Sequence, residues 1–143
     1  MVIRSSFHTG ADADRIAAWV AAGIPGCERG FGPCTAMSIW DDQAIIGGVV
    51  FHNYSPETGV MEMSAAASSP RWLTKDVLHK MHRYIFDEAG CQMAVMRVAE
   101  SNLRMRRIAE RFGYRGHKIP RLRGRGEAEI IFTLADDQRR LVR

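Results

Sequence analysis

The sequence lacks the patterns that would define several classes of protein. Its three cysteines, Cys27, Cys34 and Cys91, form no Cys-x-x-Cys pair and no Cys/His spacing typical of zinc. No apolar run reaches the roughly 18 residues of a membrane-spanning helix, and residues 1–14 do not resemble a signal peptide. We therefore expect no disulfide framework, no metal site and no membrane span, and predict a cytoplasmic protein.

Lysine is also scarce, because only Lys75, Lys80 and Lys118 contribute to the 20 basic residues. The net charge of +4 therefore comes mainly from arginine, which favours bidentate contacts with anions. This charge fits an anionic ligand or a nucleic acid, and equally a solvated surface. The aromatic motifs, helix-turn-helix signature and zinc fingers of nucleic-acid-binding modules are missing, so nucleic acid is not the favoured partner.

The composition is that of a folded globular protein. Of the 143 residues, 46% are hydrophobic and 25% are charged, which argues against disorder. This length predicts a single domain over 1–143.

The apolar pattern changes along the chain from helix to strands and back. It predicts a mixed α/β fold, with a meander of antiparallel strands followed by a βαβ unit with a right-handed crossover. A loop rich in Gly and Pro is expected at 23–35, and a loose end at 138–143. The predicted helices are 11–23, 74–90 and 102–113, and the predicted strands are 35–41, 44–54, 59–67, 92–99 and 127–137.

The helix after Thr74 has two distinct faces. Val77, Leu78, Met81, Tyr84 and Ile85 form an apolar face. The opposite face is polar, and we assign it His79 and His82. Two histidines three residues apart could share a metal ion, but without a third ligand nearby they are expected to be surface residues.

Glu62 is unusual because it lies inside an apolar strand. Alternation places Val60, Glu62 and Ser64 on one face and Met61 and Met63 on the other. A half-buried carboxylate there would be suited to accepting a proton. A carboxylate that faces solvent or pairs with an arginine is the alternative.

The order of these elements, together with "ESNLRMRRIAERFGYR", resembles the GNAT superfamily of N-acetyltransferases. The specific match is Asn102 followed by Gly113 and Tyr114, where the family has an asparagine followed by Gly-Phe. The resemblance spans about 35 to 134. "SSPRWLTKDV" looks more like small acetyltransferases of phages and prophages, in which a Pro-x-Trp turn replaces a glycine-rich one.

The resemblance implies that acetyl-CoA binds between two splayed parallel strands, here 59–67 and 92–99, with the amine entering from the opposite side. Glu62 would be the base, acting directly or through water. A backbone N–H near Ser64 to Ala66 would polarise the thioester carbonyl, and Asn102 would contact the pantetheine or order its helix. The residues that this implies for cofactor binding are Ser64, Ala65, Ala66, Arg71, Trp72, Leu73, Thr74, Lys75 and Asn102.

The turn that would hold the pyrophosphate has no glycine. Phosphate binding at a helix N-terminus needs free backbone amides and the helix dipole, not a particular side chain. If Trp72 and Leu73 point into the core, the four amides from Trp72 to Lys75 can face the phosphates, with charge from Arg71 and Lys75. Asp76 would repel phosphate, and the alternative is that Trp72 is a core anchor in a turn that binds nothing.

The general acid is not evident. The family commonly places a tyrosine where this chain has Ala109, so water, Tyr84, Tyr54 or another group would have to protonate the thiolate, or it would leave unassisted. His52 and Tyr54 would line the acceptor pocket, or simply a strand surface. Cys91 is expected to be a core residue.

Arginines gather near the C-terminal end. Alternation in "RLRGRG" would send Arg121, Arg123 and Arg125 to one side of an extended segment. With the arginines of the last helix they could bind the 3′-phosphate of CoA, an acidic acceptor or nucleic acid. The last helix contributes Arg104, Arg106, Arg107 and Arg111.

The sequence therefore predicts an N-acetyltransferase that moves an acetyl group directly from acetyl-CoA to an amine, because no activated Ser or Cys nucleophile is found. The acceptor, a small-molecule or peptide amine, is not identified, and a homodimer is an open alternative to a monomer. A catalytically inactive CoA-binding domain and an arginine-rich nucleic-acid-binding protein are the two other readings.

Overall fold

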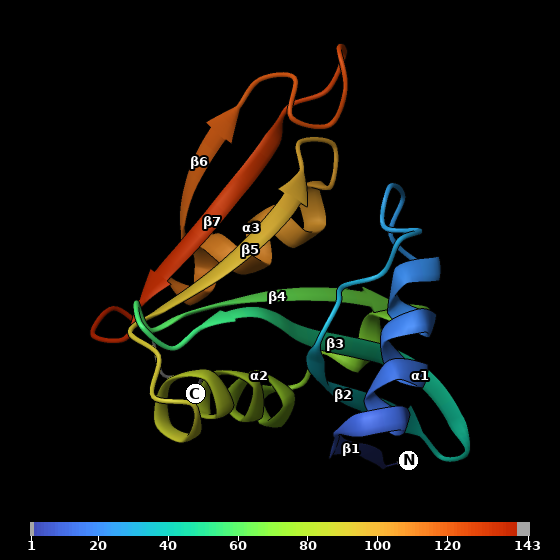
Figure 1. Cartoon of the computed structure of the whole chain (residues 1–143). Coiled ribbons are helices and arrows are strands. Elements are labelled where there is room, and N and C mark those ends of the chain that lie inside the picture. The colour runs from blue at the N-terminus through green and yellow to red at the C-terminus, as the bar shows by residue number, and fades with distance from the viewer. Residues whose placement is uncertain (1, 140–143) are drawn as a thin grey trace.

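A computed structural model describes residues 2–139, which form one seven-stranded sheet with helices packed on it (Figure 1). Of the predicted loose end, residues 140–143 lie outside the described part. In chain order the elements are β1 (Ile3–His8), α1 (Gly10–Ala22), β2 (Cys34–Asp41), β3 (Ala44–Ser55), β4 (Val60–Ala67), the 3₁₀ turn η1 (Pro70–Trp72), α2 (Lys75–Arg83), the wider π turn η2 (Tyr84–Glu88), β5 (Met93–Ala99), α3 (Leu103–Phe112), β6 (Arg115–Ile119) and β7 (Glu129–Ala135).

The predicted mixed architecture is confirmed, with two strands added. Every predicted helix and strand is present with similar bounds. The strands that the sequence did not predict are β1, which pairs with β2, and β6, which pairs with β7. Both lie at the edges of the sheet, where one neighbouring strand is missing.

One parallel pair divides the sheet. The strand order is β1-β2-β3-β4-β5-β7-β6, and every pairing is antiparallel except that of β4 with β5. That pairing covers only Val60–Met63 and Met93–Met96, after which the two strands diverge (Figure 1). The sheet is therefore open between β4 and β5 on the C-terminal side of these residues.

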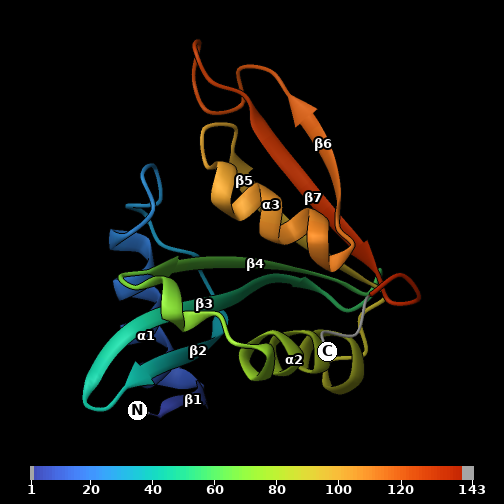
Figure 2. The same ribbon diagram turned by 180° about the vertical axis from the view of Figure 1, so that it is seen from behind.

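The helices cover both faces of the sheet. Val50 and Ala66 pack with α1, whereas their neighbours Val49 and Ala65 belong to the core under α2. Since adjacent strand residues point to opposite faces, α1 and α2 lie on opposite sides of the sheet. α3 lies beside β5 and β7 (Figure 2), where Phe112 joins the same core as α2.

Two adjacent glycines in β3 allow close packing on both faces. A Cβ atom on Gly47 would lie 2.9 Å from Cβ of Trp72, and one on Gly48 would lie 2.7 Å from Cγ2 of Val20. Trp72 is 6% exposed and fixes η1 against the sheet. The condition that Trp72 points into the core is therefore met, in agreement with both of the alternatives considered for this turn.

His82 is a core residue, which corrects its assignment to the polar face of α2. Its Nδ1 donates to the carbonyl oxygen of Leu78 at 2.8 Å, so its Nε2 accepts from the Tyr114 hydroxyl at 2.7 Å. The ring stacks on Phe112 with centroids 4.2 Å apart. A neutral imidazole whose two nitrogens are both hydrogen-bonded can take the place of an apolar side chain in the core. The spacing of apolar residues along the helix therefore does not predict that His82 is buried.

Burial lowers the pKa of His82 from 6.5 to about 4. The unfolded chain therefore binds one more proton between these two pH values, and the free energy of unfolding should fall by about 3 kcal/mol as the pH decreases through this window. Urea unfolding at pH 7 and pH 4 should show a smaller loss for His82→Gln. His117→Gln, which removes an exposed histidine, should retain the full loss. Equal losses in both variants would contradict the assignment.

Gly47→Ala should lower the free energy of unfolding by about 1–3 kcal/mol, because the new methyl group would collide with Trp72. Gly126→Ala is the matched control, since its Cβ would meet nothing within 4 Å. Denaturant unfolding of both variants tests the close approach of η1 to β3. A Gly47→Ala protein as stable as the control would contradict it.

Candidate functional site

The opening between β4 and β5 forms a cleft with a volume of about 1160 Å³. Its walls come from β4, β5 and the start of α3, and from the loop 23–31 between α1 and β2. The segment between β6 and β7 also contributes. Sequence elements that are distant in the chain therefore meet at this cleft.

Glu62 lines the cleft on the α1 side of the sheet. Its side chain is 16% exposed, while Met61 and Met63 are buried in the core on the opposite face. The predicted alternation along β4 is thus confirmed. Oε1 of Glu62 accepts a hydrogen bond of 3.0 Å from Nδ2 of Asn53.

Asn53 is a contact that the sequence analysis missed. The β3–β4 register shifts between His52 and Ser55, and Asn53 has a φ of 49°, in the left-handed region. Asparagine adopts this region more readily than most residues. The bulge therefore directs the amide of Asn53 toward Glu62, and an asparagine within an apolar strand was the signal available.

His52 lies directly opposite Glu62 on β3. Its Nε2 is 2.8 Å from Oγ of Ser64 and 3.7 Å from Oε2 of Glu62. Burial lowers the pKa of His52, although Glu62 acts in the opposite direction. We therefore treat the ring as neutral near pH 7 and its contact with Glu62 as polar rather than ionic. Its Nδ1 is buried without a partner.

The β5-facing edge of β4 is unpaired where the strands diverge. Pairing with β5 ends at Met63, while β4 continues to Ala67. The backbone polar groups that point toward β5 from Ser64 to Ala66 therefore have no strand partner. Such groups need another hydrogen-bonding partner, which a ligand or water can supply.

The turn before α2 has a defined hydrogen-bond pattern. Ser69 Oγ accepts from the Arg71 amide, and the Ser69 carbonyl accepts from the Trp72 amide, both at 3.3 Å. Thr74 caps α2 by accepting from the Val77 amide at 3.1 Å. Of the four amides expected to be free, that of Trp72 is bonded within the turn. Those of Leu73, Thr74 and Lys75 have no protein acceptor in the described part of the chain.

Charges at the turn are partly neutralised. Nη1 of Arg71 donates to Oδ2 of Asp41 at 2.9 Å, and Asp76 pairs with Lys80 at 3.2 Å. The Asp41 pair ties the turn to the end of β2. Lys75 is exposed at the first position of α2.

Asn102 lies at the start of α3 and lines the cleft. Its Oδ1 accepts from the Met105 amide at 3.2 Å, so it caps the helix. Ser64 to Ala66 and Trp72 line the same cleft, whereas Arg71, Leu73, Thr74 and Lys75 are adjacent to it in sequence but do not line it.

No tyrosine lines the cleft in the described residues. The Tyr84 hydroxyl donates to Thr35 at 3.1 Å, and the Tyr54 hydroxyl donates to the Ala89 carbonyl at 3.1 Å. Ala109 is buried. Neither tyrosine considered as an acid therefore lines the cleft that contains Glu62.

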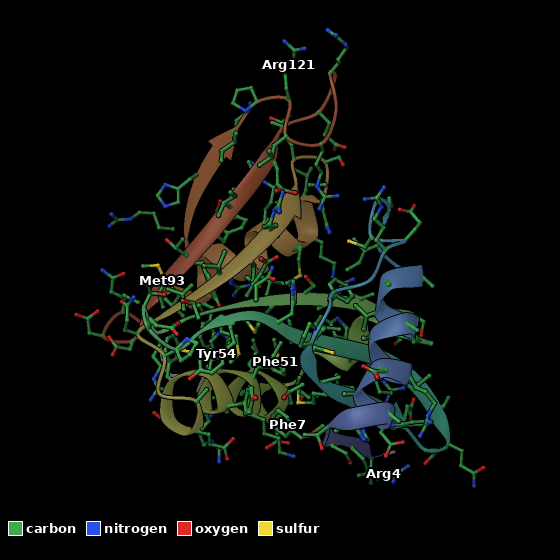
Figure 3. All side chains as sticks on the ribbon, in the orientation of Figure 1. Arg4, Phe7, Phe51, Tyr54, Met93 and Arg121 are labelled. Carbon is green, nitrogen blue, oxygen red and sulfur yellow. The ribbon has the colours of Figure 1, made fainter. Side chains whose placement is uncertain are left out.

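The expected extended arginine segment is not formed, which corrects that prediction. Arg121 has a φ of 66° in a turn and lies at the tip of the β6–β7 segment (Figure 3). Arg123 instead reaches back to Glu129, where its Nε donates to Oε2 at 2.8 Å. Nε of Arg97, on β5, donates to Oε1 of the same carboxylate at 2.5 Å. Turns replace the strand because Gly124 and Arg121 both take positive φ values.

Metal sites and membrane-spanning helices were not favoured by the sequence analysis. The described residues contain no group of His, Cys, Asp or Glu that could hold a metal ion. None of the helices in the described part has both the length and the apolar character to cross a bilayer. The three cysteines are free, and Cys91 is buried as predicted.

Solved structures with a similar fold are acetyltransferases by name. A spermidine/spermine N-acetyltransferase from Vibrio cholerae, in mutant form, is 10% identical with a TM-score of 0.72, over 94% of this chain and 96% of its own. A GCN5-related N-acetyltransferase from Brucella melitensis is 15% identical with a TM-score of 0.66, over 95% and 76%. At these identities the similarity establishes the fold.

A third structure, described as a probable acetyltransferase, is 16% identical with a TM-score of 0.63 over 71% of this chain. The present chain spans 61% of the length of that protein. The sequence matches no curated protein at a significant level. The model of the acetyltransferase (GNAT) domain family, however, matches residues 3–115. Because this match covers most of the sequence, the chain belongs to the GNAT family of acetyltransferases.

Proposed function

We propose that the protein is an N-acetyltransferase that uses acetyl-CoA and transfers the acetyl group directly to an amine. The observation that carries the proposal is the opening between β4 and β5, which brings an unpaired strand edge and Glu62 to one cleft. The free cysteines fit a reducing compartment, and we propose the cytoplasm as the site of action.

The cleft and the turn have groups that fit acetyl-CoA. The unpaired edge from Ser64 to Ala66 offers amide and carbonyl groups to the amide-containing pantetheine arm. The amides of Leu73, Thr74 and Lys75 and the positive end of α2 offer a site for the pyrophosphate. Arg71 and Lys75 would add charge, Trp72 would hold the turn in place, and Asn102 would order the start of α3 beside the pantetheine.

When bound, acetyl-CoA supplies an acyl group activated as a thioester. Glu62 accepts the proton that the amine loses as its nitrogen forms the new bond to the acyl carbon and the carbon–sulfur bond breaks. Asn53 holds the Glu62 carboxylate in place through Oε1, and the His52 ring lies 3.7 Å from Oε2. No described tyrosine lines the cleft, and we propose solvent as the source of the proton that the departing thiolate would take up.

A second candidate is an acetyltransferase-like domain that binds CoA without catalysing transfer. It is favoured by the absence of tyrosine from the cleft and by the pairing of Arg71 with Asp41. The two proposals differ in turnover on amines.

Arg71→Ala/Lys75→Ala should weaken acetyl-CoA binding at least about tenfold, because two charges next to the phosphates are lost. Isothermal titration calorimetry measures this directly. Arg4→Ala/Arg15→Ala removes the same charge from β1 and α1, away from the cleft, and should bind like the native protein. If both double variants bound equally well, the turn would not be the pyrophosphate site.

Glu62→Gln should bind acetyl-CoA with unchanged affinity. Its rate of amine acetylation should fall at least about 100-fold, because the base is removed. Release of the CoA thiol, followed for a panel of primary amines, measures the rate. Glu57→Gln, at an exposed turn, is the control. A native protein that binds acetyl-CoA and acetylates no amine would favour the binding-domain alternative. A Glu62→Gln protein with native rates would remove Glu62 from the mechanism.

A further inference from the structure

We infer that the acceptor is an amine that also carries an anionic group, a carboxylate or a phosphate, which Arg97 and Arg123 bind. This rests on the proposed function, because it names the class of amine that the same cleft accepts. The observation behind it is a pair of guanidinium groups held at the cleft by one buried carboxylate.

Glu129 fixes both arginines through their Nε atoms. It is 2% exposed, and its two oxygens each accept one hydrogen bond, from Arg97 at 2.5 Å and from Arg123 at 2.8 Å. In the described residues, no hydrogen bond is found from the Nη atoms of either arginine. Both guanidinium groups are therefore ordered, while their terminal donors remain available to a ligand.

The cluster is positive and accessible. Two guanidinium groups face one carboxylate, which leaves one positive charge in excess. The side chains of Arg97 and Arg123 are 45% and 21% exposed, and both line the cleft. An anion with two oxygens could thus contact both groups, and it would complete the neutralisation that Glu129 begins.

The cluster lies on the same face of the sheet as Glu62. Val95 is directly opposite Glu62 in the β4–β5 register, and Arg97 is two residues further along β5. Side chains two residues apart on a strand share a face. Arg97 is near enough to contribute to the lowered pKa of His52, after the larger effect of burial.

The other acidic residues that line the cleft are Glu28, Glu62 and Glu127, and the other basic ones are Arg29 and Arg104. Oε2 of Glu127 accepts from the Ser101 hydroxyl at 2.7 Å, at the start of α3, and Glu28 accepts from the Gly26 amide within the loop. An acceptor whose amine lies at Glu62 and whose anion lies at the arginines matches both ends of this surface. A polyamine would place a second positive charge against the arginines and would be repelled.

The experiment compares acceptors that differ only in the anion. The pairs are glycine and glycinamide, which test a carboxylate, and phosphoethanolamine and ethanolamine, which test a phosphate. Spermidine serves as the polyamine. At least one anionic member should exceed its neutral partner about tenfold or more in kcat/KM, and spermidine should be the poorer substrate.

Arg97→Lys keeps the charge but loses the planar fork, so it should reduce that preference about tenfold, mainly through the KM of the acceptor. The KM of acetyl-CoA should not change. Arg123→Lys is a second variant in case the first fails to fold, and thermal unfolding reports on both. Arg121→Gln, at the tip of the same β6–β7 segment and outside the cleft, should retain the full preference.

A titration without turnover separates this inference from the proposed function. The reaction products N-acetylglycine and N-acetylethanolamine phosphate, and their neutral counterparts, are added to ¹⁵N-labelled native protein and followed by NMR. Shifts near Arg97 with an anionic product alone support the anion site, even if acetyl-CoA does not bind. Equal responses to charged and neutral products, no response to any of them, or an unchanged preference in Arg97→Lys would overturn the inference.

Discussion

The point at which β4 and β5 stop pairing determines the rest of the site. Beyond Met63 and Met96, each strand keeps its outer neighbour and loses its inner one, so backbone groups face the gap with no partner from the sheet. Backbone N–H and C=O groups that are buried without a partner raise the free energy of the folded state. A ligand that forms hydrogen bonds with them gains the binding energy that a neighbouring strand would otherwise have supplied. Alanines along this edge leave its backbone open to approach. The cleft is thus built mainly by backbone geometry, and side chains add charged and polar groups at its margins.

The sequence predicts the parts of the fold that have a strong local period. The meander and the helices have such a period, whereas β6 is exposed throughout and offers no apolar alternation to detect. Glu62 could be found because a carboxylate in an apolar strand is conspicuous. Glu129 carries the same signal, but its partner Arg97 is 32 residues away and no local pattern connects them. Asn53 required the β3 bulge, which depends on the pairing of two strands.

The errors in the sequence analysis have one physical origin. His82 was assigned to the polar face of its helix and Arg123 to one side of an extended segment, yet specific partners, Tyr114 and Glu129, place them. Polar groups become core or cleft residues when the fold satisfies their hydrogen bonds. The family resemblance identified the turn before α2 as a candidate site. The pairing of Arg71 with Asp41 could not be predicted, because it depends on the fold bringing the end of β2 next to this turn.

The two glycines of β3 have a mechanical consequence. At Gly47 and Gly48 the sheet is a single layer of backbone, with α1 in contact on one side and Trp72 on the other. No side chain lies between them to change rotamer and absorb a displacement. A shift of α1, which leads directly into the cleft-lining loop 23–31, would therefore be transmitted through β3 to the turn at the opposite face. At this point β3 therefore couples the position of α1 mechanically to that of Trp72.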